Sequence, residues 1–388
     1  MNTVMPNINL HIYHSSITHE SRMLKETQTV AEAGFADQVV LIGRWREGLL
    51  ESEHIDAKRQ IWRVRMRIGA NSSSRLVKVI RYVEWFARIF WRYRKCRVTV
   101  VNCHSVMELP IAPLFKLLRG SKIIYDTHEL ETETTGLTGH LQKALRLIER
   151  SLIPFASAII TVNGSIAAWY KDTYNLDQVF IVRNIPIQPK HLPKSNVLKD
   201  KLGLTTEQML FIYQGALEEG RGIYLLLNVF QRLPPDKHIV FMGMGTLIDA
   251  VKACAQRFPN IHFIPAVPPA QLLEYTCSAD VGLSIIENIS LSYYLSLPNK
   301  VFEYLLAGLP IIVSDFPEMA YVIQKSQAGW AVPVDRDRLY ALISQITWED
   351  IQVAQRHASE YRLTIGWHEE AKILRSVYQH LALSDSNC

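Results

Sequence analysis

Apolar, strand-like segments alternate with helix-like segments along most of the chain, and this alternation restricts the possible folds more than any other feature. In the first half, the helix-like segments 21–34 and 73–95 separate short apolar stretches at 9–14, 37–43 and 98–102. The second half repeats the arrangement with further apolar stretches and helices. Repeated strand–helix–strand units favour parallel sheets with helices on both faces. We therefore expect an α/β protein with doubly wound, Rossmann-like sheets.

A proline-rich stretch at 181–195 interrupts the alternation and is typical of a linker. The chain has 388 residues, more than one domain usually holds. We predict one Rossmann-like domain over 1–187 and a second over 188–365. Residues 366–388 are predicted to form a C-terminal helix, for which packing back on the N-terminal domain is one alternative.

The composition is that of a globular protein, but its charge is unevenly distributed. Hydrophobic residues make up 48% and charged residues 20%, and no apolar run is long enough to predict a membrane span. The N-terminus has no secretory pattern, and the five cysteines lack metal-ligand spacing, which favours a reducing cytosol and argues against a structural metal. Residues 1–187 carry 25 Lys and Arg against 17 Asp and Glu, whereas 188–388 carry 17 against 20. We therefore expect the N-terminal half to meet an anionic partner.

Glycines and a cation follow the predicted strands of the second half. Gly215 ends a strand, Arg221 lies between two further glycines before a helix, and Gly243 and Gly245 follow the next strand. Bare backbone and helix N-termini can approach a phosphate group. Because ligands of open α/β sheets bind beyond the carboxyl ends of the strands, we expect these loops to line a crevice between the two domains.

The segment LPNKVFEYLLAGLPIIVSD, residues 297–315, predicts a short helix followed by a buried strand. Lys300 and Glu303 share a face of that helix. A lysine in the first turn opposes the helix dipole, which favours anions there. One interpretation is a solvated Lys–Glu pair, and the other is that Lys300 meets an anionic ligand at the helix start.

Four of these motifs, in this order, resemble the nucleotide-binding domain of GT-B glycosyltransferases, especially glycosyltransferase family 4. The motifs are YQGALEEGRG, FMGMG, FIPAVPPAQLLEYTCSADVGLS and LPNKVFEYLLAGLPIIVSD. The segments SRMLKETQTVAEAG, VVNCHSVMELP and KIIYDTHELE are similar, more loosely, to the acceptor domain of members that build bacterial surface polysaccharides. The resemblance implies the GT-B fold, in which two Rossmann-like domains face each other across a cleft, and a nucleotide-sugar donor held mostly by the C-terminal domain.

The resemblance also implies roles for individual residues. Glu303 matches the glutamate that holds the ribose, and Arg221 matches the cation on the diphosphate, with Lys300 beside it. Val267 falls where backbone groups meet the base, and His128 matches the active-site histidine of the N-terminal domain. Two positions depart from the pattern: Leu295 stands where a second glutamate is common, and Ala216 stands where an arginine is common.

These matches predict a hexosyltransferase that uses a UDP-sugar in preference to other donors, retains the anomeric configuration and needs neither metal nor cofactor. Arg221 and Lys300 would stabilise the leaving diphosphate. An inverting enzyme would need a base, for which Asp126, Glu129 and Glu20 are the candidates, and His104 is an alternative to His128. A sugar-nucleotide epimerase or hydrolase on the same scaffold, and a nucleic-acid-binding module, remain alternatives.

The helix-like segment 75–97 predicts attachment to a membrane surface. One arc of this helix is expected to face anionic lipid headgroups, and the opposite arc, which includes Val79 and Val83, is expected to pack on the sheet. The lipid-facing residues are Lys78, Arg81, Trp85, Arg88, Arg92 and Lys95. Arg63, Arg65 and Arg67 are expected to add to this basic surface. We therefore predict a protein of the cytoplasm that is attached peripherally to the inner face of the plasma membrane and acts on a lipid-linked or glycan acceptor.

Overall fold

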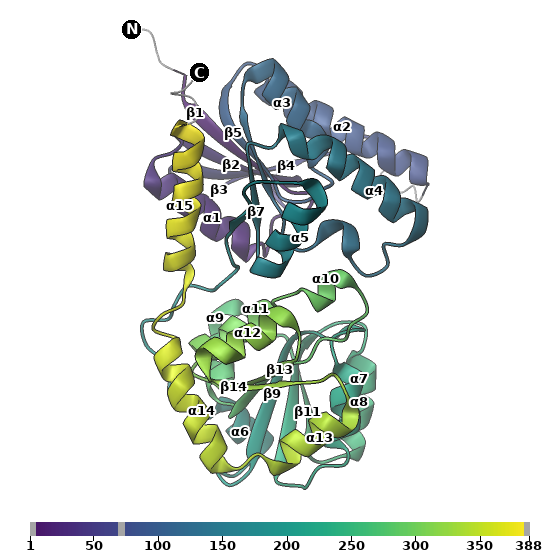
Figure 1. The fold of residues 1–388 in the computed structure, drawn as a ribbon, viewed down its shortest axis with the longest axis vertical. Coiled ribbons are helices and arrows are strands. Elements are labelled where there is room, and N and C mark those ends of the chain that lie inside the picture. The colour runs from purple at the N-terminus through teal and green to yellow at the C-terminus, as the bar shows by residue number, and fades with distance from the viewer. Residues whose placement is uncertain (1–4, 69–73, 384–388) are drawn as a thin grey trace. The chain divides into compact units, whose positions relative to one another are not determined.

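The structure is a computed structural model that describes residues 5–68 and 74–383. Two compact units can be separated (Figure 1). The first contains residues 1–183 together with the segment from residue 370 onward, and the second contains residues 184–369. The sequence analysis predicted these two boundaries after residues 187 and 365.

An eight-stranded sheet forms the centre of the first unit. Its strands are β1 (Asn7–Ile12), β2 (Gln38–Arg44), β3 (Ser52–His54), β4 (Arg59–Val64), β5 (Arg97–Cys103), β6 (Lys122–Asp126), β7 (Ala158–Thr161) and β8 (Phe180–Ile181). The spatial order is β3-β4-β2-β1-β5-β6-β7-β8, and every pair is parallel except β3 with β4. Strand β1 pairs with β2 and β5, so the chain runs outward on one side of β1 and then returns to its other side.

Helices cover both faces of this sheet. Its helices are α1 (Ser21–Ala33), α2 (Arg75–Tyr93), α3 (Ala112–Arg119), α4 (Gly139–Leu152), α5 (Gly164–Tyr174) and most of α15 (Trp367–Leu383). Figure 1 shows α1 and α15 on one side of the sheet and α2, α3 and α4 on the other. This follows from right-handed crossovers, because the chain reverses its direction across the sheet after β4. On α15, the Tyr378 hydroxyl donates to Asn102 Oδ1 of β5 (3.1 Å) and accepts from Asn9 Nδ2 of β1 (2.7 Å).

The second unit has a fully parallel six-stranded sheet in the order β11-β10-β9-β12-β13-β14. Its strands are β9 (Met209–Ala216), β10 (Lys237–Met244), β11 (Ile261–Pro265), β12 (Val281–Ser284), β13 (Ile311–Ser314) and β14 (Gly329–Val332). Its helices are α6 (Val197–Leu202), α7 (Ile223–Phe230), α8 (Ile248–Arg257), α9 (Pro269–Cys277), α10 (Leu291–Tyr294), α11 (Asn299–Leu306), α12 (Pro317–Ser326), α13 (Arg336–Gln345) and α14 (Trp348–Tyr361).

Two apolar cores lie against the faces of this second sheet. One contains Val301, Phe302 and Leu305 of α11, and the other contains Leu226 and Phe230 of α7. Helix α11 stops where the sequence predicts, because Gly308 takes a left-handed conformation (φ 77°) and Pro310 follows. The apolar stripe of α11 is therefore buried, and Lys300 and Glu303 occupy another part of its surface.

Candidate active site

The loops that follow β9 and β12 meet where the strand order of the second unit reverses. Strands β9 and β12 are neighbours in the sheet but lie far apart in sequence. Ligands of open α/β sheets bind beyond the carboxyl ends of the strands at such a switch point. The loop after β9 contains Arg221, and the loop after β12 contains Glu287.

Lys300 is a buried cation in this region, with only 8% of its surface exposed. Among the described residues, its Nζ has no hydrogen-bond partner and lies 3.6 Å from the centroid of the Tyr213 ring. Burial lowers the pKa of Lys300 well below its usual value, the positive charge of Arg221 lowers it further, and Glu303 opposes the shift. Lys300 therefore lies close enough to both groups to interact with them, and its ammonium is left without a full complement of acceptors.

Arg221 lies in a tight turn that two glycines make possible. Gly220 and Gly222 have positive φ values of 74° and 72°, and a Cβ at Gly222 would lie 2.8 Å from the main chain of Ile285. Glu287 holds this turn, because its Oε1 accepts from Gly222 N (3.2 Å) and its own N–H donates to Gly220 O (2.9 Å).

The guanidinium of Arg221 lies 4.7 Å from the centroid of the Tyr293 ring. The guanidinium of Arg221 forms no hydrogen bond or ion pair with any described residue, although its main-chain N–H donates to Glu218 O (3.3 Å). The turn thus presents a cation whose charge is not neutralised by a carboxylate partner.

Glu303 is held in place by its neighbours on the sheet. Gln214 Nε2 donates to Glu303 Oε2 at 2.5 Å. Gln214 is oriented in turn by Thr276, whose hydroxyl donates to Gln214 Oε1 at 2.8 Å, and by Tyr304, whose Oη accepts from Gln214 N at 2.9 Å. A carboxylate fixed in this way can accept hydrogen bonds from two vicinal hydroxyls with its remaining lone pairs.

The other residues assigned to the nucleotide lie at the same carboxyl edge. Gly215 and Gly243 pair with each other near the ends of β9 and β10, and Gly245 directly follows β10. A Cβ at Gly243 would lie 1.8 Å from Gly215 O, and one at Gly215 would come within 3.7 Å of Lys300 Nζ. Val267 follows β11 and is partly buried against the core. The glycines therefore keep the backbone bare beside Lys300.

In the first unit, the reversal of strand order lies between β1 and β5. Tyr13 and His14 follow β1, His104 follows β5, and His128 follows β6 closely. The rings of Tyr13 and His128 have their centroids 5.2 Å apart. This edge therefore gathers the aromatic and ionisable residues of the N-terminal unit.

Asp126 is buried and ion-paired, which differs from its expected place in an acceptor-facing loop. Arg22 of α1 donates from Nη2 to Asp126 Oδ1 (2.6 Å) and from Nε to Oδ2 (3.2 Å). The guanidinium and the hydrogen bonds from two histidines hold the pKa of Asp126 well below its usual range despite burial. Asp126 is 1% exposed. The geometry favours a role in orienting histidines over one as a base that contacts the acceptor.

Three histidines form a hydrogen-bonded chain beside Asp126. His104 Nδ1 lies 3.0 Å from Asp126 Oδ2 and 3.0 Å from His128 Nε2, and His104 Nε2 lies 2.8 Å from His11 Nδ1. Burial lowers the pKa of His104 to about 4 and that of His11 well below its usual value. With a neutral His104 that carries its proton on Nδ1, His11 must donate to His104 Nε2. His128, with 22% of its side chain exposed, is the solvent-facing member.

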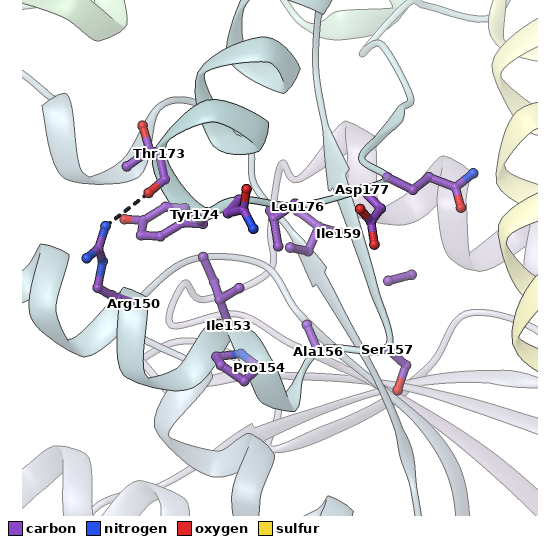
Figure 2. A pocket seen from close by; sticks show the side chains of 13 residues that line it. Arg150, Ile153, Pro154, Ala156, Ser157, Ile159, Thr173, Tyr174, Leu176 and Asp177 are labelled. Carbon is purple, nitrogen blue, oxygen red and sulfur yellow. Dashed lines mark hydrogen bonds between the residues drawn. The ribbon is translucent and has the colours of Figure 1, made fainter.

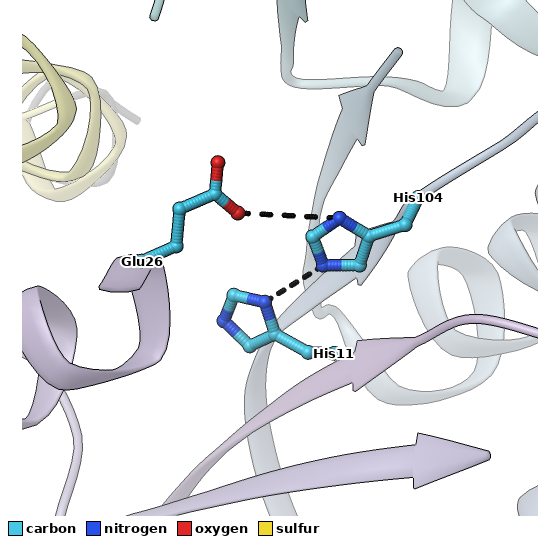
Figure 3. Close-up of side chains that lie close together, drawn as sticks. All are labelled: His11, Glu26 and His104. Atoms are coloured by element: carbon cyan, nitrogen blue, oxygen red, sulfur yellow. Dashed lines mark hydrogen bonds and ion pairs between the residues drawn. The ribbon is translucent and has the colours of Figure 1, made fainter. Parts of the chain in front are cut away.

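Glu26 of α1 completes this cluster (Figure 3). Its Oε2 lies 4.0 Å from His104 Nδ1, and its Oε1 lies 2.9 Å from Arg22 Nε. Burial raises the pKa of Glu26 well above its usual value. Two sets of side chains have ligand atoms close enough to hold a metal ion, namely His11, Glu26 and His104, and His104, Asp126 and His128. The absence of a metal requirement stays a prediction.

Glu129 and Glu20, the other carboxylates considered as bases, lie near Tyr13. Glu129 is exposed and Glu20 is half-buried at the start of α1. Burial raises the pKa of Tyr13, and the charges of Glu131, Glu108, Glu129 and Glu20 add to the shift. These carboxylates therefore surround a neutral phenol at the carboxyl edge of the first sheet.

The predicted lipid-facing arc of α2 is wrong at Trp85, and the arc predicted to pack is wrong at Val79 and Val83. Trp85 is fully buried, and it forms the packed stripe with Ile89 and Tyr93. Val79 and Val83, which were expected to pack, are 60% and 61% exposed. The sequence analysis expected the arc with Val79 and Val83 to face the core. Trp85, Ile89 and Tyr93, spaced four residues apart, instead supply the larger side chains that fill the space above the sheet.

The basic residues of this region also differ in their surroundings. Arg88 pairs with Glu84 (2.7 Å), and Arg92 stacks on Trp62 (4.6 Å to the ring centroid). Lys78, Arg81 and Lys95 are at least partly exposed. Arg63 is 3% exposed and donates to the carbonyl oxygens of Ser16, Ile17 and Leu50, so its predicted place on a basic surface is wrong.

A cavity of about 640 Å³ lies elsewhere in the first unit (Figure 2). Its lining includes Ala156 and Ser157, which precede β7, and Tyr174, which ends α5. These residues belong to the amino edge of the parallel strands, opposite to the edge where the histidines lie. This cavity therefore does not belong to the candidate active site.

Several residues of these clusters were not singled out from the sequence. In the second unit they are Tyr213, Gln214 and Tyr293. In the first unit they are His11, Arg22, Glu26 and Glu108. Gln214 directly precedes Gly215 on β9, so its position could have marked it as a candidate from the sequence. Arg22 and Asp126 are 104 positions apart, so only the fold brings them together.

The comparisons with known proteins agree with this geometry. Residues 208–347 match the family model described as Glycosyl transferases group 1. A protein of Bacillus subtilis (strain 168), named as a candidate teichuronic acid biosynthesis glycosyltransferase, TuaC, is 24% identical over 247 residues. That match spans 62% of this chain and 60% of the relative's own length.

Solved structures resemble the whole chain. Sucrose-phosphate synthase from Thermosynechococcus elongatus has a TM-score of 0.80 at 14% identity, and the match covers 97% of this chain and 100% of that one. Anabaena HepE, solved in complex with UDP, has a TM-score of 0.69 at 13% identity over 98% of this chain and 100% of that one.

The fold class is GT-B, with two Rossmann-like units, as the sequence predicts. The match of residues 208–347 to the group 1 glycosyl transferases agrees with the resemblance found in the sequence of the C-terminal unit. No helix in the described part of the chain has the length and apolar character needed to cross a membrane.

Proposed function

We propose that this glycosyltransferase moves a hexose from a nucleoside-diphosphate sugar, with UDP-sugars favoured, to a lipid-linked or polysaccharide acceptor in bacterial surface glycan synthesis. The observation that carries the proposal is the buried, unpartnered ammonium of Lys300 next to Arg221 and Glu303. A buried cation of this kind is costly unless an anion completes its coordination. HepE of the same fold was solved with UDP and with UDP-glucose, which supports the choice of donor.

In the proposed reaction, Arg221 and Lys300 bind the diphosphate and stabilise the charge that develops as the bond to the anomeric carbon breaks. The bare backbone at Gly215 and Gly243 permits close approach of the phosphates. Glu303, held by Gln214, accepts hydrogen bonds from the ribose hydroxyls. Val267 contacts the base. No step in this scheme uses a metal or a cofactor.

His128 of the N-terminal unit is proposed to contact the acceptor, with His104 and Asp126 orienting its ring. The transfer is proposed to retain the anomeric configuration. If it inverts instead, Glu129 and Glu20 are better placed as bases than Asp126, because Asp126 is buried and paired with Arg22.

The N-terminal unit is also proposed to attach to the inner face of the plasma membrane. The supporting surface is an apolar stripe on α2, which replaces the basic arc expected from the sequence. It consists of Leu76, Val79, Ile80 and Val83, each at least 40% exposed. Exposed Lys78 and Lys95 would add attraction to anionic lipid. Flotation with anionic vesicles should show binding that Val79→Ser/Val83→Ser weakens, and an unbound wild-type protein at low salt would disprove attachment.

The donor assignment can be tested by thermal unfolding with UDP, GDP, ADP and a single-stranded oligonucleotide, followed by turnover with UDP-hexoses. We expect UDP to raise Tm by several degrees and the oligonucleotide to leave it unchanged. Arg221→Ala and Glu303→Ala should each reduce turnover strongly, and near-normal activity in both variants would overturn the site. Release of free sugar at full rate without any acceptor would indicate a hydrolase instead.

A further inference from the structure

The two cations that are proposed to bind the donor diphosphate each lie against the face of a tyrosine ring. The guanidinium carbon of Arg221 is 4.7 Å from the centroid of the Tyr293 ring, and the ammonium of Lys300 is 3.6 Å from the centroid of the Tyr213 ring. Among the described residues, neither cationic group has a hydrogen-bond partner. The proposed function uses both cations and neither tyrosine.

These four side chains belong to one cluster. Burial raises the pKa of Tyr213, Arg221 lowers it and Tyr293 raises it further, so both residues lie near Tyr213. Burial also lowers the pKa of Lys300, and the charge of Arg221 adds to that shift. Because the two cations repel each other, each needs a favourable contact to stay in place. The ring faces supply such contacts.

A ring face holds a cation in a different way from a carboxylate. The negative face of the ring attracts the charge without neutralising it, and it takes up few of the five N–H donors of a guanidinium. A carboxylate would neutralise the charge and accept two of those donors, so an anionic ligand would have to displace it. Arg221 on the Tyr293 ring therefore keeps its charge and its donors available.

The carboxylates next to the Arg221 turn are engaged elsewhere. Glu218 accepts hydrogen bonds from the main-chain N–H of Thr246 (2.9 Å) and from the hydroxyl of the same residue. Glu287 Oε1 accepts from Gly222 N (3.2 Å). In the described part of the chain, neither carboxylate pairs with the Arg221 guanidinium. Tyr293 is therefore the side chain that orients this cation.

Tyr293 is itself fixed by its main chain. The hydroxyl of Ser290, at the start of α10, accepts from Tyr293 N (3.2 Å), and the Tyr293 carbonyl oxygen accepts from the hydroxyl of Ser296 (2.8 Å). A Cβ at Gly220 would lie 3.0 Å from Tyr293 Cε2, so the bare backbone of Gly220 lets the two loops pack closely. The Tyr293 ring is also partly buried against the core. These contacts hold the ring beside the turn that carries Arg221.

We propose that Tyr293 is a positioning residue of the donor site, whose ring face holds the Arg221 guanidinium in place for the diphosphate of the donor. Tyr293 acts through Arg221 and does not need to contact the ligand. The proposal rests on the proposed glycosyltransferase function. Without the ring, the guanidinium is free to turn away from Lys300, and ordering it again on binding has an entropic cost. The affinity for the donor and the stabilisation of the leaving diphosphate should both fall.

Calorimetric titration of the full-length protein with UDP tests the proposal in a double-mutant cycle. The four proteins are the wild type, Tyr293→Leu, Arg221→Ala and the double variant. We expect Tyr293→Leu to weaken UDP binding about threefold to tenfold in the wild-type background, and by less than about twofold in the Arg221→Ala background.

Two further variants serve as controls. Tyr293→Phe keeps the ring face and should bind UDP as the wild type does. Tyr321→Leu removes an exposed ring of α12 that lies 5.6 Å from the ammonium of Lys325, and it should leave UDP binding unchanged.

Unchanged UDP binding in Tyr293→Leu would overturn the proposal. Equal weakening in both Arg221 backgrounds would do the same, because Tyr293 would then only support the fold. A loss in Tyr293→Phe as large as that in Tyr293→Leu would transfer the role to the hydroxyl and also overturn the proposal.

A wild-type protein that binds no UDP would refute the proposed donor instead. Urea unfolding of the same four proteins would then decide whether the ring holds Arg221. The changes in the free energy of unfolding should be non-additive if Tyr293 and Arg221 interact as proposed, and additive changes would overturn the proposal.

Discussion

The two units differ in whether their buried ionisable groups have partners. In the first unit, Asp126 has a bidentate guanidinium partner in Arg22 and a further contact with His104. In the second unit, Lys300 is also buried, but its Nζ has no hydrogen-bond partner among the described residues. The ion pair of Asp126 can be understood from the chain alone, whereas burial lowers the pKa of the partnerless Lys300, which would gain from an anionic ligand. The comparison therefore favours a positioning role for Asp126 and supports the proposal that Lys300 binds a ligand.

The largest effect should follow from removing the compensating partner in the first unit. Arg22→Met leaves Asp126 and Glu26 buried without their cation and should lower the free energy of unfolding by about 3–5 kcal/mol. Arg232→Met, which breaks the exposed pair with Asp337, is the matched control and should cost less than about 1 kcal/mol. Urea unfolding measures both. Equal losses in the two variants would show that the buried pair has no special role.

The opposite result is expected for the uncompensated charge in the second unit. Lys300→Met should reduce turnover about 10²–10³-fold, as for the loss of one group that stabilises transition-state charge. The same change should stabilise the free protein by about 1–3 kcal/mol, because a buried group without partners is removed. The exposed Lys325→Met should alter neither quantity.

The pH dependence gives a second check on Lys300. The folded-state pKa of Lys300 lies below its unfolded value of 10.5, so the unfolded chain binds the extra proton between these two values. The stability of the wild-type protein should therefore rise with pH across this window relative to Lys300→Met. A stability difference that does not change with pH would place Lys300 in a compensated environment, like Asp126.

The smallest effect should come from removing metal ions. His104, Asp126 and His128 have suitable ligand atoms within reach of one another, but Asp126 already neutralises Arg22. We therefore expect turnover to stay unchanged after dialysis against EDTA, measured with a UDP-hexose and an acceptor. If activity is lost and zinc or manganese restores it, the histidine–aspartate cluster of the first unit binds a metal ion that turnover requires.

The sequence was most informative where the site is made of contiguous segments. Arg221 lies in the loop that follows β9, and Lys300 and Glu303 lie within one turn of one helix, so local patterns and the family resemblance were sufficient to single them out. The cluster of the first unit depends on Arg22 and Asp126, which are distant in sequence. No local pattern contains that pairing.

The orientation of α2 could not be predicted for a different reason. Periodicity finds apolar arcs, and this helix has two of them, with Val79 and Val83 on one and Trp85 and Ile89 on the other. Which arc packs depends on the shape of the space above β2 and β4, where large rings fit better than valines. The remaining exposed arc is the one that the proposed membrane attachment uses.

The central claim is that Lys300 binds the diphosphate of the donor. Calorimetric titration of UDP in buffers of different ionisation enthalpy tests it most directly, because it counts the protons taken up on binding. A bound diphosphate should raise the pKa of Lys300, so at a pH between its values in the free and the bound protein the wild-type protein should bind UDP with net uptake of protons, and Lys300→Met should lose both the uptake and most of the affinity. Binding of UDP that is equally tight in Lys300→Met, with no proton uptake in either protein, would contradict the account.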